Sequence, residues 1–119
     1  MKDFLLGAVA YPLLEICWRG RTHPTMALAG GLSSALLLRL HRAHMPCGQA
    51  ALLGGCAITL MEGVIGLRWN RRHQIWDYRR MPCNWRGQVC LPYTALWCLL
   101  SWAVLRFFQA AQKKLLALF

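Results

Sequence analysis

Four apolar segments separated by short basic stretches constrain this chain more than any other feature. They cover residues 4–18, 24–40, 48–67 and 91–108. A helix needs about 20 apolar residues to cross a hydrocarbon core of about 30 Å. The first two segments are shorter, but flanking residues such as Trp18 and Arg19 can reach the headgroups. Because lipid cannot satisfy an exposed backbone, the sequence predicts an all-α, polytopic membrane protein with four transmembrane helices in one domain, 1–119.

The charge pattern favours a membrane surface over nucleic acid as the partner. The chain is 57% hydrophobic with only 15% charged residues, and its net charge is +10. A nucleic-acid-binding protein needs a solvated basic face, whereas these arginines punctuate apolar runs, as cations at headgroups do. We therefore expect membrane lipids, and not nucleic acid, as partners. Eight basic residues on the side of the longest loop against six on the other weakly favour a cytoplasmic loop.

The loop 69–90, WNRRHQIWDYRRMPCNWRGQVC, is both aromatic and basic. Its tryptophans and tyrosine suit the headgroup level, so we expect an ordered loop lying across the membrane face. Asp77 can pair with Arg79 or Arg80. A gating lid over a polar cavity would have the same composition. The candidate ligands of lipid phosphates are Arg71, Arg72, Arg79, Arg80 and Arg86.

Two glutamates within apolar segments are the sharpest functional signal. A charged residue at the bilayer centre costs about 2.5 kcal/mol or more, so Glu15 and Glu62 are predicted to face the bundle interior. Tyr11 lies one turn before Glu15 on the same helix face. These acids could couple a proton or cation, bind substrate or ligate a metal. A salt bridge to a nearby arginine such as Arg19 or Arg68 is the structural alternative.

A cluster with acid–base or metal-binding chemistry would need further residues. His23 could join Glu15, Glu62 and Asp77 in such a cluster, although a capping or interfacial histidine explains it as well. No C-x-x-C or H-E-x-x-H spacing is present, so the sequence predicts no metal site and no cofactor.

Small residues recur at helical spacing in the two central segments. One set is Ala27, Gly31 and Ala35, and the other is Gly55, Thr59, Gly63 and Gly66. Small residues on one face let helix backbones approach closely, so both sets are predicted to lie in helix–helix contacts.

Four motifs in order resemble a known family. They are GAVAYPLLE, RGRTHPTMALAGGLSSALL, LMEGVIGLRWN and WDYRRMPCNWRGQVCLPYTALW, between Gly7 and Trp97. Together they resemble the ABC-transporter type IV family of small, permease-like bacterial membrane proteins. The chain departs from the family pattern at Arg79, where a small polar residue is usual. By resemblance, the site residues are Tyr11, Glu15, His23, Glu62, Asn70, Trp76, Asp77, Tyr78 and Asn84.

The resemblance implies a transporter of the bacterial inner membrane. The chain has no Walker loop and cannot itself hydrolyse ATP in that way, so another transporter subunit is a possible partner. A homo-oligomer, with a dimer favoured, is also expected because four short helices are few for a complete permease.

The leading functional hypothesis is a permease-like unit with a polar intramembrane site built on Glu15 and Glu62. One alternative is an antiparallel exporter of the small-multidrug type. Another is an intramembrane enzyme acting on a lipid or prenyl phosphate, for which Glu15, His23, Glu62 and Asp77 would have to converge. The sequence favours transport over catalysis.

Overall fold

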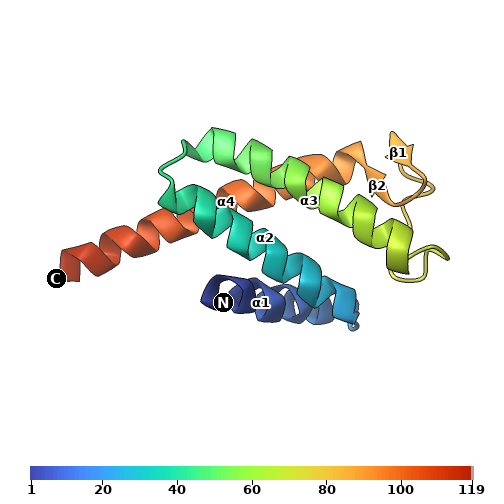
Figure 1. Ribbon diagram of the computed structural model, residues 1–119, viewed down its shortest axis with the longest axis horizontal. Coiled ribbons are helices and arrows are strands. Elements are labelled where there is room, and N and C mark those ends of the chain that lie inside the picture. The colour runs from blue at the N-terminus through green and yellow to red at the C-terminus, as the bar shows by residue number, and fades with distance from the viewer. Residues whose placement is uncertain (119) are drawn as a thin grey trace.

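The computed structural model describes residues 1–118 as four helices and one short β-ribbon (Figure 1). The helices are α1 (Lys2–Arg19), α2 (Pro24–Arg42), α3 (Cys47–Trp69) and α4 (Leu91–Leu118). The ribbon pairs β1 (Asn84–Trp85) with β2 (Val89–Cys90) in antiparallel register. The chain is mostly helical, as predicted, and the ribbon is an element that the all-α prediction did not include.

Local chemistry sets the turn between α1 and α2. Gly20 ends α1 with φ of 75°, a left-handed conformation that glycine adopts without steric cost. His23 is the N-cap of α2, where its Nδ1 accepts a hydrogen bond from the Thr25 backbone at 3.2 Å. Pro24 follows at the first helical position, which needs no donor. The three residues thus fix a tight connection.

The helices pack as two antiparallel hairpins, α1 with α2 and α3 with α4, which meet mainly along α2 and α3. Glycines allow these close approaches: a Cβ added at Gly30 would lie 2.6 Å from the Tyr11 Cβ, and one at Gly55 would lie 2.7 Å from the Cys98 backbone nitrogen. Gly66 differs from the prediction. A Cβ there would meet the Gln88 side chain of the loop, not another helix.

The two ends of the bundle differ. Figure 1 shows the ribbon and the loop before it at one end, while the N-terminus, the C-terminus and the α2–α3 connection lie toward the other. The loop closes its end by burying Trp76 and Tyr78 against Met26, Ile65 and Cys90. The loop is therefore part of the core of the molecule.

Two helices, α3 and α4, are long and apolar enough to cross a membrane. Only 39% of the α3 window and 17% of the α4 window is buried, unlike the core helix of a soluble protein. Large apolar side chains such as Leu60 and Leu99 are 71% and 67% exposed, which suits a lipid-facing surface. Four spans are not established by these criteria, because α1 and α2 do not meet them.

Candidate functional site

Glu62 lies at the centre of the candidate site, where three segments meet. The Tyr78 hydroxyl donates to its Oε1 at 2.9 Å, and the Trp97 indole Nε1 donates to its Oε2 at 3.0 Å. Tyr78 belongs to the loop and Trp97 to α4. Both carboxyl oxygens therefore have donors, as a buried carboxyl requires. Glu62 and Arg68 form no ion pair among residues 1–118, and the Arg68 guanidinium lies 5.6 Å from the Trp69 ring centroid.

Aromatic rings surround this carboxyl. The Tyr78 and Tyr93 rings stack with centroids 4.7 Å apart, and the Trp97 ring lies 6.1 Å from Tyr93 and 6.2 Å from Tyr11. Tilted and offset pairs at such distances stabilise one another beyond simple burial. Tyr11 comes from α1, so the aromatic cluster connects the two hairpins around Glu62.

A cavity of about 410 Å³ opens beside this cluster. All four helices contribute to its walls, which are largely apolar, and Glu62 is the one charged residue among the described residues that line it. A mostly apolar cavity with few polar groups is the usual form of a small-molecule site. Glu62 thus faces both the loop and the cavity.

Glu15 has a different environment. Its Oε2 forms an ion pair with Arg19, as the structural alternative predicted, and Arg19 also donates to the Ile75 carbonyl at 3.5 Å. Its Oε1 is buried with no hydrogen-bond partner among residues 1–118. Of the two acids, only Glu62 lines the cavity.

An amide pair holds the loop against α3. The Asn70 side chain donates to the Trp76 carbonyl at 2.7 Å and to Gln88 Oε1 at 2.9 Å, and accepts from the Ile75 backbone at 2.8 Å. Gln88 Nε2 returns a bond to the Asn70 carbonyl at 2.9 Å. Asn70 and Gln88 are 1% and 2% exposed, so the network is shielded from water.

Two further motif residues also bind the loop to itself. The Trp76 indole donates to the Gln88 carbonyl at 2.9 Å. Asn84 donates to the Met81 carbonyl at 2.9 Å and accepts from the Gly87 backbone at 3.0 Å. Gly87 has φ of 67°, which favours glycine in this turn. Trp76 and Asn84 therefore shape the loop, and neither lines the cavity.

Tyr78 and Asp77 are neighbours in sequence with opposite surroundings. Burial, reinforced by the Glu62 charge, raises the pKa of the Tyr78 hydroxyl, which therefore stays protonated and can donate. Asp77 is exposed and forms hydrogen bonds with the Arg79 guanidinium at 2.7 and 2.9 Å. These bonds hold the pKa of Asp77 well below its usual range. Asp77 stabilises the outer surface of the loop through Arg79, and among the described residues it does not bind Glu62.

The structure does not bring the four proposed acid–base residues together. His23 caps α2, Asp77 pairs with Arg79 on the surface, and Glu15 pairs with Arg19, while Glu62 binds Tyr78 and Trp97. Within residues 1–118 no three His, Cys, Asp or Glu side chains are placed to hold a metal ion.

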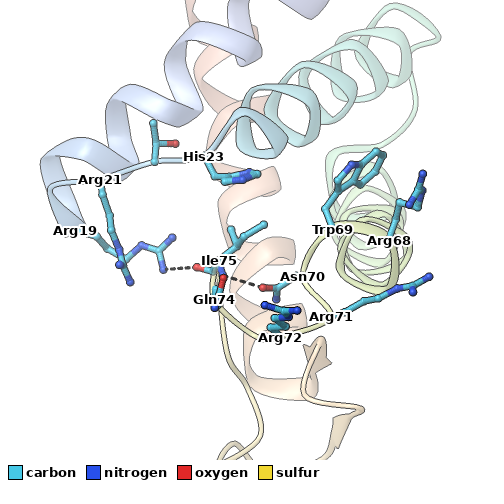
Figure 2. Close-up of a pocket in the computed structure, with 11 residues that line it drawn as sticks. Arg19, Arg21, His23, Arg68, Trp69, Asn70, Arg71, Arg72, Gln74 and Ile75 are labelled. Carbon is cyan, nitrogen blue, oxygen red and sulfur yellow. Dashed lines mark hydrogen bonds between the residues drawn. The ribbon is translucent and has the colours of Figure 1, made fainter.

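The candidate lipid-phosphate arginines do not gather in a single pocket. Arg71 and Arg72 line a pocket at the loop end of the bundle (Figure 2). Arg79 and Arg80 line another with Asp77. The Arg86 guanidinium lies 4.8 Å from the Trp85 ring centroid.

Sequence reasoning missed Trp97 and Gln88, although both contact motif residues. Trp97 ends the last motif of the resemblance, and a tryptophan inside an apolar segment needs a partner for its N–H. Gln88 is a polar residue directly before a strand, with no local pattern to indicate burial. The first could have been inferred from its chemistry, and the second could not.

Comparison with known families gives a match over most of the chain. The sequence model of the family described as "Putative ABC-transporter type IV" matches residues 20–119. The chain belongs to this family. The matched region includes His23, Glu62, Asn70 and the entire loop, whereas the opening motif with Tyr11 and Glu15 precedes it. No curated protein and no solved structure matches the chain. Membership of this transporter-type family, with two apolar helices, indicates a membrane protein.

Proposed function

We propose that this protein is a permease-like unit of the bacterial inner membrane, in which Glu62 is the polar centre of a substrate or ion path. The observation that carries the proposal is the double role of Glu62. Its carboxyl is held by the loop through Tyr78 and by α4 through Trp97, and it also lines the cavity between the hairpins. A carboxyl in apolar surroundings is a functional candidate by default.

The loop is the gate in this proposal. Breaking the Tyr78–Glu62 hydrogen bond would release the buried tyrosine from the helix bundle and leave the Glu62 carboxyl free for a proton, a cation or a polar substrate group. Formation of the same bond would close the path. Two contacts would be present in the closed state and absent in the open state: the hydrogen bond from Tyr78 to Glu62 and the stacking of Tyr78 on Tyr93.

A four-span arrangement is also part of the proposal. Asp3 pairs with Arg42 at one end of the α1–α2 hairpin, and Arg19 donates to the Ile75 carbonyl of the loop at the other. An α1 of 18 residues is about 27 Å long. It would thus run beside α2 over nearly the thickness of a hydrocarbon core of about 30 Å.

Membrane lipids, a second copy of the chain and another transporter subunit remain the proposed partners. The apolar side chains exposed on α3 and α4 offer the surface for them.

Transport by purified protein in proteoliposomes tests the role of Glu62. Wild type is screened against protons, monovalent cations and small polar solutes, and the flux found is measured again with Glu62→Gln. We expect this variant to keep the shape of the site, because glutamine is nearly isosteric with glutamate, but to lower the flux at least tenfold. Glu15→Gln, which removes the acid that does not line the cavity, is the comparison. Equal flux in wild type and Glu62→Gln for every transported species would overturn the proposal.

A further inference from the structure

The strongest concentration of unpaired charge lies outside the Glu62 site, in a pocket of about 500 Å³ at the loop end of the bundle. Five arginines line it, from segments far apart in the chain: Arg19, Arg21, Arg68, Arg71 and Arg72. Figure 2 shows Arg19 and Arg21 on the side of α1, and the other three around the end of α3 and the residues after it.

These arginines have few acidic partners. Arg19 pairs with Glu15, but the ion pairs formed within residues 1–118 do not include the other four. Arg71 donates from Nε to the Leu67 carbonyl at 3.0 Å, which leaves its terminal nitrogens unused. Arg21 and Arg72 form no hydrogen bond with the described residues. The pocket therefore presents guanidinium donors together with uncompensated positive charge.

Neighbouring groups add to the positive electrostatic potential of the pocket. His23 and Thr22, which precede α2, also line the pocket, so the positive end of the α2 dipole lies beside it. No acidic residue is among the described residues that line the pocket, and Glu15 is already bound to Arg19. Water can solvate each guanidinium separately, but a multiply charged anion would bind several of them at once.

We propose that this pocket binds a phosphate group as a monoester, which approaches two negative charges near neutral pH. A carboxylate has one charge and accepts one guanidinium fork, whereas a phosphate offers more charge and several oxygens to forks arriving from different sides. The volume of about 500 Å³ leaves room for the substituent on the phosphate. Arg19 donates to the Ile75 carbonyl, so a bound anion would lie where α1 meets the loop.

The phosphate could come from a lipid headgroup or from a soluble compound, and the experiment separates these sources. Full-length protein in nonionic detergent, stripped of lipid, is titrated with inorganic phosphate at constant ionic strength, and binding is followed by calorimetry. In a second arm, the protein is reconstituted in phosphatidylcholine nanodiscs with and without phosphatidic acid, and retained phospholipid is measured by native mass spectrometry.

The decisive variant is Arg21→Gln with Arg72→Gln, and the matched control is Arg39→Gln with Arg106→Gln, which removes two exposed arginines that do not line this pocket. Loss of one hydrogen bond to a charged group costs about tenfold in affinity. We expect at least tenfold weaker binding in the Arg21/Arg72 variant and less than twofold change in the Arg39/Arg106 control. If the Arg21/Arg72 variant loses inorganic phosphate binding, the source is a soluble compound. If it loses only the retention of phosphatidic acid, the source is a lipid.

Two results would overturn the proposal: neither ligand distinguishes the Arg21/Arg72 variant from wild type, or the Arg39/Arg106 control weakens binding as strongly. Circular dichroism checks the helical content of each variant. If the double glutamine variant does not fold, the pair Arg21→Lys and Arg72→Lys decides, because lysine keeps the charge but loses the planar fork. Weaker binding than in Arg39→Lys with Arg106→Lys supports the site, and unchanged binding refutes it. The assay measures binding alone, so its outcome is independent of transport through the Glu62 site.

Discussion

Tyr78 is the residue through which the loop reaches the middle of the bundle. It carries one hydrogen bond to Glu62, stacks on Tyr93 and donates its backbone N–H to the Gly87 carbonyl at 2.9 Å. Tyr78 therefore connects the loop to the buried Glu62 carboxyl. Its surroundings suggest two tests at the scale of single residues.

Tyr78→Phe should destabilise the protein because it removes one donor from the buried Glu62 carboxyl while keeping the ring. We expect the free energy of unfolding to fall by about 1–3 kcal/mol, measured by denaturant titration in mixed micelles. Tyr93→Phe is the matched control, since the Tyr93 hydroxyl forms no hydrogen bond among residues 1–118. Equal losses in the two variants would mean that the effect comes from removing any tyrosine hydroxyl here, and not from the hydrogen bond to Glu62.

Asp77 should give the loop a dependence on pH. Its pKa is lower in the folded protein than its ordinary value of 3.8 because Arg79 donates to it. Ionised Asp77 therefore stabilises the folded loop fully above pH of about 4, and this contribution is lost as pH falls through 3.8 toward the folded pKa. Hydrogen exchange of loop amides should rise over that range in wild type, relative to the intrinsic rate, and much less in Asp77→Asn. A parallel rise in both would exclude Asp77 as the cause.

The burial of Glu62 could be predicted from the sequence more readily than the partners of either glutamate. The cost of a carboxyl in an apolar segment predicted that Glu15 and Glu62 would lie inside. Glu62 is buried and accepts from Tyr78, whereas Glu15 is only half-buried and pairs with Arg19. Their partners could not be read in the same way: Arg19 is one turn away from Glu15, but Tyr78 and Trp97 lie 16 and 35 residues from Glu62. Distant pairings depend on how the loop folds, which local patterns do not specify.

At the scale of elements, glycines decide how closely the helices and loop approach. Helix existence followed from apolar segments alone, and the small-residue spacing correctly indicated a close contact at Gly55. The same spacing could not distinguish a helix partner from a loop partner. Gly66 therefore proved to accommodate Gln88, and the ribbon was missed because each of its strands has only two residues.

Gly55→Ala should separate α3 from α4, since the added methyl would lie 2.7 Å from the Cys98 backbone nitrogen. Overpacking of this kind costs about 1–3 kcal/mol. Gly48→Ala is the control in the same helix, because nothing lies within 4 Å of a Cβ there, and we expect it to be neutral or stabilising by up to about 1 kcal/mol. Thermal unfolding in detergent measures both. A stable Gly55→Ala protein would show that the hairpin can open without loss.

The network between Asn70 and Gln88 connects the end of α3 to the loop. Asn70→Ala would leave the Trp76 carbonyl and the Ile75 N–H without their side-chain partner, at a cost of at least about 2 kcal/mol. Hydrogen exchange should accelerate at the amides of residues 75–78 before those of α3. A double-mutant cycle with Gln88→Ala should give a coupling energy above about 0.5 kcal/mol, whereas additive effects would mean that the two amides act independently.

At the scale of the whole molecule, the chain has two chemically different ends. The loop end carries the arginine pocket, and the opposite end carries both termini (Figure 1). Ion pairs or hydrogen bonds of α1 reach both ends, to Arg42 and to Ile75. A bundle built this way should have a single orientation in the membrane.

Labelling with a membrane-impermeant maleimide tests this orientation. Exposed Cys83 of the loop is retained as the single cysteine in one variant, and Lys2→Cys supplies the single cysteine of another. In sealed vesicles of uniform orientation we expect Cys83 to react from one face and the residue at position 2 from the opposite face. Labelling of each position from both faces to equal extents would instead favour the antiparallel arrangement.

The bond between Asn70 and Gln88 also dictates an order of events during synthesis. Asn70 leaves the ribosome 18 residues before its partner, so α3 can enter the membrane while its own end is still uncapped. The loop cannot close against the end of α3 until Gln88, shortly before α4, has been synthesised. Truncated nascent chains ending before position 88 should therefore remain open to proteases at this end, whatever the state of the first hairpin.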